Sequence, residues 1–238
     1  MEPMATALEG LQMPVHDRSD RWPASGGPRW YARPAVDDAN AAPDESDVRA
    51  AWDAEAFDRA ATTALERYGP ELLGYLHAMA RPPLDPDDLF SELCERLWRK
   101  LPEFRWESSL RTWAYVIARN LLRSGFRAAR GPRGRVDALG TSEVSKVADR
   151  IRSSTPPHIR TKAKDRLQEI RDGLDPDDQS LLILRVDRNM AWRDIADVLA
   201  DPDDARSASQ RAAALRKRFE RLKERLRREM QASARESS

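Results

Sequence analysis

The chain contains few of the residues that build disulfides, metal centres or catalytic triads. Cys94 is the single cysteine among 238 residues, and the three histidines, His16, His77 and His158, are far apart in the sequence. One cysteine excludes an intramolecular disulfide and the cysteine–histidine spacings of zinc sites, and it favours a reducing compartment. A glycine-rich phosphate loop is missing as well. We therefore expect no catalytic residues, no metal, no cofactor and no enzymatic activity.

Long apolar runs are also missing. The longest strongly apolar run is Leu181–Leu184, far short of the roughly 20 residues that cross a membrane. The N-terminus has no positive segment followed by an apolar stretch, so it does not look like a signal peptide. We expect a cytoplasmic protein without a membrane span. Aromatic residues make up 7% and charged residues 34% of the chain, which favours two small helical units over one large core.

The net charge of +1 conceals a strong segregation of charge. Eight acidic residues and one basic residue, Arg49, occur between Asp37 and Asp58. Between Arg211 and Arg228 there are nine basic residues and two acidic ones. Such a partition indicates different partners for different segments of the chain.

Local signals predict an all-α fold of two small helical domains, residues 51–130 and 161–232, joined by a flexible linker at 131–160. Residues 1–50 are rich in Pro, Gly, Ala and Asp without a sustained apolar period, so we expect a disordered extension. The tail at 233–238 is expected to be disordered too. Apolar spacing predicts helices over residues 50–67, 70–80, 85–101, 109–129, 161–173, 176–187, 191–200 and 208–230, with a weak helical turn near 142–151.

Several prolines and an aspartate set the expected helix ends in the first domain. Pro70 suits a first helical turn. Asp85, followed by Pro86, is a helix cap, and Pro102 ends that helix. Three acids at this start, with Asp87 and Asp88, could be imagined as metal ligands, but capping and the helix dipole explain them better. Cys94 lies on the apolar side of the same helix and is expected to be a buried thiol.

The helix at 109–129 combines a buried stripe with cations and aromatics. Leu110, Trp113, Ile117 and Leu121 account for the stripe, which leaves several arginines for other faces. Arginine binds phosphate through forked hydrogen bonds, and aromatic rings stack on unpaired bases. The preceding connection contains Phe104 and Trp106, and we expect both to be exposed, as exposed aromatics in a loop indicate function.

The residues DPDDLFSELCERLWRKLPEFRWESSLRTWAYVIARN, from Asp85 to Asn120, resemble conserved region 2 of the sigma-70 family, in particular the extracytoplasmic-function (ECF) sigma factors. The resemblance extends over roughly residues 50–130. It implies that the helix from Asp85 docks on the clamp coiled coil of the RNA polymerase β′ subunit. One departure is Ser91, where many relatives carry glutamine. The implied docking residues are Asp87, Asp88, Leu89, Glu92 and Arg96.

The same resemblance implies a role in opening promoter DNA. Residues 103–109 match the loop that captures a flipped base of the −10 element, and the following helix matches the stretch that supports strand opening and contacts −10 DNA. The implied residues are Phe104, Arg105, Trp106, Glu107, Ser108, Arg111, Trp113, Tyr115, Arg119, Asn120, Arg123 and Arg127.

The second domain resembles sigma region 4, a winged-helix-like helix-turn-helix that reads the −35 element and binds the β flap. Residues 192–199 resemble its first helix, and residues 215–221 line up with its recognition helix. The intervening segment 201–210 is longer and more acidic than in relatives, unless the recognition helix begins near Ser207. In relatives the linker threads toward the RNA exit path. The implied −35 residues are Arg211, Arg216, Lys217, Arg218 and Arg221.

The partners implied by the resemblance are RNA polymerase core and promoter DNA, and an anti-sigma factor remains open. The resemblance also implies association with the nucleoid when the protein is bound to polymerase. Two other functions also stay open. One is a polymerase-independent helix-turn-helix regulator that dimerises through residues 215–230. The other is a degenerate sigma-like interaction protein that sequesters a partner without initiating transcription, an option that the long acidic turn at 201–210 keeps alive.

Overall fold

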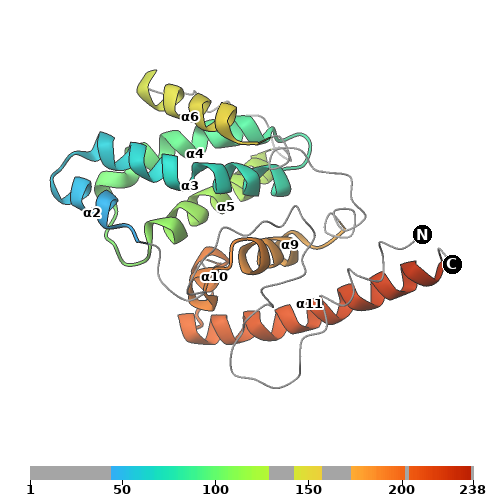
Figure 1. The fold of residues 1–238 in the computed structure, drawn as a ribbon. Helices are drawn as coiled ribbons and strands as arrows, with labels where there is room; N and C mark the ends of the chain where they lie inside the picture. Colours follow the sequence, from blue (N-terminus) through green and yellow to red (C-terminus); the bar gives the residue numbers. More distant parts are fainter. Residues whose placement is uncertain (1–43, 129–141, 157–172, 202–203, 237–238) are drawn as a thin grey trace. The chain divides into compact units, whose positions relative to one another are not determined.

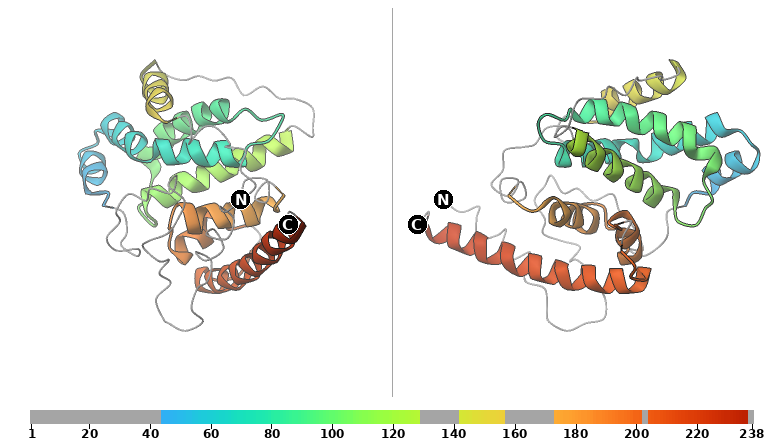
Figure 2. Two further views of the ribbon diagram at one scale, coloured as in Figure 1. Left: turned by 45° about the vertical axis from the view of Figure 1, so that its right-hand side comes forward. Right: turned by 180° about the vertical axis from the view of Figure 1, so that it is seen from behind.

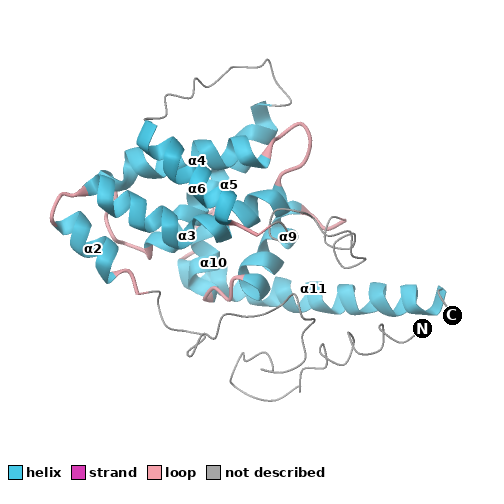
Figure 3. Ribbon diagram, turned by 45° about the horizontal axis from the view of Figure 1, so that its top comes forward, coloured by secondary structure: helices cyan, strands magenta, loops and turns pink. Residues whose placement is uncertain are grey.

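The computed structural model describes residues 44–128, 142–156, 173–201 and 204–236. Every regular element in these ranges is helical, and no strand occurs among them (Figure 1, Figure 3). The all-α fold is therefore as the sequence predicts. The described residues up to Arg216 belong to one compact unit, and those from Lys217 onward belong to a second. Residues 161–172 of the helix expected at 161–173 lie outside the described residues.

The first two helices differ from the expected ones. Helix α2 covers Ser46–Asp53 and α3 covers Phe57–Met79. The chain breaks between them at Glu55, whose φ is 57°, although neither Gly nor Pro stands there. Pro70, expected to begin a helix, lies inside α3. An internal proline costs one backbone hydrogen bond, and the fully buried Leu65 and Leu72 on either side of it outweigh that loss by packing into the same core.

Helices α4, Pro86–Lys100, and α5, Leu110–Ala128, occur where the sequence predicts them. The Asp85 carboxylate accepts from the backbone N–H groups of Asp87, at 2.8 Å, and Asp88, at 3.1 Å, as expected of a cap. A short 3₁₀ turn, η1, at Leu101–Glu103 follows α4. Cys94 is fully buried, and burial raises the pKa of its thiol to about 12, so it is the inert core thiol that the sequence predicts.

A full helix, α6, covers Ser142–Ser154 where the sequence predicts only a weak turn inside a linker. It packs on α3 and α4 (yellow in Figures 1 and 2). Its buried residues, Val144, Val147, Ala148 and Ile151, recur at the i, i+3, i+4, i+7 spacing of an amphipathic helix. Tertiary burial therefore makes this segment a helix.

The C-terminal helices follow the predicted pattern. Helix α9 covers Pro176–Leu182, continues through a π-helical turn η2 at Ile183–Asp187, and is followed by α10 at Trp192–Val198. Helix α11 covers Ala208–Glu236, so it extends beyond the expected end at 230 and into the tail at 233–238 that was expected to be disordered. Its start at Ala208 agrees with the earlier of the two expected starts for this helix, near Ser207. None of the helices in the described part of the chain is both long enough and apolar enough to cross a membrane.

Candidate nucleic-acid and polymerase interface

The start of α5 is capped by a residue from far away in the sequence. The Glu45 carboxylate accepts from the backbone N–H of Leu110, at 2.8 Å, and of Arg111, at 2.9 Å. It also accepts from the hydroxyl of Tyr68 at 2.8 Å, and burial together with this carboxylate raises the pKa of that phenol. A carboxylate is favourable at a helix N-terminus, where unpaired N–H groups gather. Glu45 thus fixes the position of the start of α5 and of the preceding loop. It belongs to residues 1–50, which were expected to be disordered.

Arg111 is held by protein groups on several sides. Its guanidinium forms a forked pair with Glu71, Nε to Oε1 at 2.7 Å and Nη2 to Oε2 at 2.8 Å. Nη2 also donates to the backbone carbonyl of Arg188 at 3.0 Å. Arg188 in turn donates from Nη2 to the carbonyl of Glu71 at 3.1 Å. A forked pair of this kind orients the cation strongly, so Arg111 is a structural anchor in this conformation.

The loop aromatics form a packed cluster. The Phe104 ring lies 4.8 Å from that of Trp113 and 4.9 Å from that of Trp106, measured between centroids. Trp106, with φ of 57°, meets Trp52 edge to face at 6.2 Å, and the Arg49 guanidinium lies 4.8 Å from the centre of the Trp106 ring. Phe104 is only 6% exposed. The expectation that Phe104 is exposed is wrong, because the rings of Trp106 and Trp113 pack against it.

Two further residues implied for DNA opening are also buried. Tyr115 is fully buried, with its ring 5.3 Å from that of Tyr75, and burial raises the pKa of its phenol. Arg119 is 7% exposed, and its Nη2 lies 2.6 Å from the carboxylate of Asp177 on α9. Neither side chain can reach a nucleic acid in this conformation. Both belong to the contact between α3, α5 and α9.

Other candidates for −10 DNA are accessible. Arg105, Glu107, Asn120 and Arg127 are exposed, and Trp106, Ser108, Trp113 and Arg123 are half-buried. Trp113 is thus less deeply buried than its place on the predicted stripe indicates. Arg123 has an exposed ion pair, 3.3 Å long, with Asp201. The accessible set gathers cations with half-exposed indoles at the loop and along α5, the combination that suits phosphate contact and base stacking.

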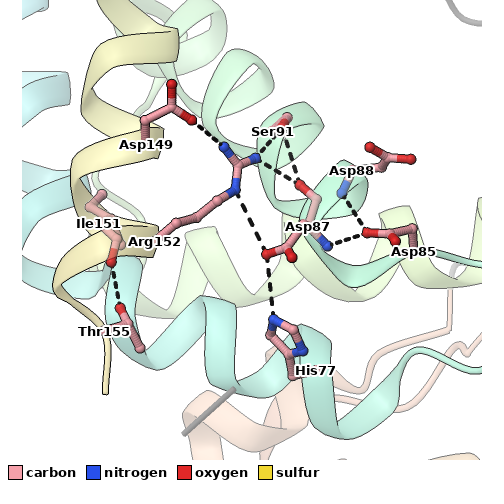
Figure 4. Close-up of polar contacts among 9 residues, drawn as sticks. All are labelled: His77, Asp85, Asp87, Asp88, Ser91, Asp149, Ile151, Arg152 and Thr155. Carbon is pink, nitrogen blue, oxygen red and sulfur yellow. Dashed lines mark hydrogen bonds and ion pairs between the residues drawn. The ribbon is translucent and has the colours of Figure 1, made fainter. Parts of the chain in front are cut away.

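The implied docking residues of α4 differ in accessibility. Asp88 is exposed, and Glu92 and Arg96 form a half-buried i,i+4 ion pair. Leu89 is 7% exposed and belongs to the core, so it does not present its side chain to a partner. Asp87 lies 3.5 Å from His77 Nε2 and 3.7 Å from Arg152 Nε of helix α6 (Figure 4).

The implied −35 residues are spread along the first half of α11. Arg216, Lys217 and Arg221 are exposed, whereas Arg218 is half-buried. Arg211 pairs with Asp197 of α10 at 3.5 Å, and its Nη1 donates to the carbonyl of Arg206 at 2.6 Å. The turn before α11 is ordered in part by Asp204, whose pKa is lowered to about 2 by hydrogen bonds from Arg206. Arg211 thus binds the turn before α11, whereas Arg216, Lys217 and Arg221 remain accessible.

Sequence reasoning missed the residues that organise this interface. Most of them are polar or aromatic residues whose partners are more than 40 positions away, as with Glu45 and Leu110, so local periodicity does not reveal them. The missed residues are Glu45, Arg49, Trp52, Glu71, Arg152, Asp177 and Arg188.

The fold and site define an all-α protein whose helix α5 carries accessible cations beside an indole-lined loop. Residues 64–131 match the family model described as sigma-70 region 2. This segment is therefore similar to region 2 of the sigma-70 family, the part of those proteins that binds RNA polymerase and melts promoter DNA. The match includes α4, the loop and α5 and ends before α6. Comparison with the curated proteins and with the solved structures found no match.

Proposed function

We propose that the protein is a sigma factor of the ECF type, which binds RNA polymerase core and directs promoter opening. The observation that carries this proposal is the match of residues 64–131 to the region 2 family model. The matched segment contains both the loop aromatics and α5. In this proposal α4 docks on the β′ clamp through Asp87, Asp88, Glu92 and Arg96. The buried Leu89 supports that helix from within.

The proposed DNA contacts are the accessible ones. Trp106 and Trp113 stack on an unpaired −10 base, while Arg105 and Arg127 neutralise phosphates. Trapping a flipped base offsets an unstacking cost of a few kcal/mol. Phe104, Tyr115 and Arg119 act indirectly, because they shape the loop and α5. For the −35 element, the accessible cations Arg216, Lys217 and Arg221 of α11 are the proposed contacts.

Run-off transcription with core polymerase tests the proposal. The protein should give promoter-dependent transcripts, and Trp106→Ala should reduce them on duplex templates while leaving transcription from a pre-melted template nearly intact. Equal activity of this variant on duplex promoters would remove the loop from the mechanism. Circular dichroism of the variant checks that its helices are retained.

Two other functions are distinguished by the same materials. Tight, specific binding to duplex DNA in a gel shift without polymerase would favour an independent helix-turn-helix regulator. Binding to core without any promoter-dependent transcript would favour a degenerate sigma-like interaction protein. The ion pairs of Arg111 and Arg119 with protein carboxylates favour this last function, because they make both arginines unavailable to DNA.

A further inference from the structure

Helix α6 lies on the same end of α4 that carries the proposed polymerase-docking residues. Figure 4 shows Arg152, in the last turn of α6, directed at the first turn of α4. Its Nη2 donates to the backbone carbonyl of Asp87 at 2.8 Å and to the hydroxyl of Ser91. Its guanidinium also lies 5.6 Å from the centre of the Phe90 ring. A single arginine of α6 therefore contacts three neighbouring residues of the docking helix.

The guanidinium is fixed from both helices. Asp149, one turn earlier on α6, accepts from Nη1 of Arg152 at 2.8 Å, and Asp87 places Oδ1 3.7 Å from its Nε. The Arg152 side chain is only 20% exposed. Several charge-assisted hydrogen bonds on one planar cation make a contact of defined geometry.

A neighbouring face of α6, which carries Ile151, fits α3 closely. A Cβ atom built on Gly69 would lie 2.7 Å from Cδ1 of Ile151, so glycine at this position lets α6 approach α3. An ion pair of 2.9 Å between Arg150 and Glu66 lies at the solvent-exposed edge of the same contact. The close approach, the buried aliphatic stripe and the Arg152 contacts together indicate a specific docking site for α6.

We propose that α6 is an intramolecular occupant of the polymerase-docking surface, and that α6 and RNA polymerase core compete for the Asp87–Ser91 edge of α4. This inference rests on the proposed function, since it assigns that edge to the polymerase. A helix as short as α6, 13 residues, is marginal in water without packing. Its displacement by a larger partner therefore releases it as a largely unfolded segment, and only the fraction of molecules with α6 displaced binds core.

A reversible crosslink across the exposed edge tests the competition in the full chain. Glu66→Cys and Arg150→Cys are combined, and the two thiols are joined with a short crosslinker that contains a reducible bond; Cys94 is buried and does not react. The linked protein should lose at least tenfold in affinity for core polymerase, and reduction should restore it. The two single-cysteine variants treated with the same reagent are the controls. Equal affinity of the linked and reduced forms would overturn the inference.

Matched arginine substitutions give a second test. Arg152→Ala should raise the apparent affinity for core by about tenfold, because apparent affinity scales with the competent fraction. Arg152→Lys should give a smaller increase, since lysine lacks the planar fork. Arg150→Ala, which removes only an exposed pair, should change affinity less than about twofold. Unchanged or weaker binding of Arg152→Ala, with amide exchange showing α6 released, would contradict the competition.

These tests separate the inference from the proposed function. If neither the untreated protein nor any variant binds core, the proposed sigma function fails and the inference with it. If the untreated protein binds core and supports transcription but the crosslink changes nothing, the inference alone fails.

Discussion

The arginines of α5 and the cations of α11 arise from similar amphipathic patterns but have different surroundings. Arg111 and Arg119 are mostly buried and hold carboxylates of α3 and α9 at 2.7 and 2.6 Å. Lys217 and Arg221 are exposed, and within the part of the chain that the structure describes the Nε of Arg221 has a long contact of 3.4 Å to the carbonyl of Lys217. The difference teaches that an arginine on an amphipathic helix is a candidate for DNA contact only where no internal carboxylate engages it.

The largest expected effect concerns the aromatic support of α5. Phe104→Ala removes a buried ring that packs on Trp113, and we expect it to lower the free energy of unfolding by about 3 kcal/mol. The exposed neighbour variant Arg105→Ala should stay within about 0.5 kcal/mol of the original protein. Urea denaturation followed by circular dichroism measures both. Equal stability of the two variants would show that the loop does not help to position α5.

Removal of the carboxylate that holds Arg111 should have the next largest effect. Glu71→Ala leaves the Arg111 guanidinium, about one-fifth exposed, without its forked partner, and we expect a loss of about 2 kcal/mol. Asp53→Ala is the matched control, because its pair with Arg49 is about half exposed and worth less than about 1 kcal/mol. Urea unfolding of the two variants at low salt compares them. A loss as small as that of the control would place the α5 arginines in the same class as those of α11.

A smaller and opposite effect is expected at Asp194 on α10. Burial, and then the nearby Asp197, raise the pKa of this carboxyl, so the folded state penalises its ionised form. The free energy of unfolding therefore falls as the pH rises from the ordinary pKa of the unfolded chain, about 3.9, through the raised pKa of the folded state. Asp194→Asn should be more stable than the original protein at pH 7, and the difference should vanish below the ordinary pKa. Paired urea titrations across this pH range would show a constant difference if the carboxyl were not perturbed.

The smallest effect on stability is expected at the accessible cations of α11. Arg221→Ala should leave the free energy of unfolding within about 0.5 kcal/mol and reduce the dependence of transcription on the −35 element. If Arg221 contacts phosphate, the salt dependence of DNA affinity in the polymerase complex should fall by about one unit of slope. A marked loss of stability instead would mean that the α11 cations are structural, like Arg111 and Arg119 of α5. The proposed difference between the two helices would then be wrong.

The helices most closely predicted from the sequence are those with local signals. Asp85 with Pro86 marks the start of α4 because its carboxylate caps N–H groups two and three residues away. The prediction that a helix begins at Pro70 is wrong, because residues packed on both sides of this proline hold α3 together as one helix. The sequence predicts only a weak turn where α6 forms. Its few aliphatic residues stabilise a full helix because they pack against α3 at Gly69 and against α4.

The amino-acid sequence by itself determined the helical class, the main stripes of α4, α5 and α11, and the similarity of residues 64–131 to sigma-70 region 2, since all of these depend on residues close together in the chain. Only the tertiary structure decided which cations and aromatics are available. Glu45 caps α5 from 65 positions away, Glu71 holds Arg111 from 40, and Arg152 reaches Asp87 from 65. The physical reason is that desolvation and pairing of a charge depend on spatial neighbours, which a linear pattern does not specify.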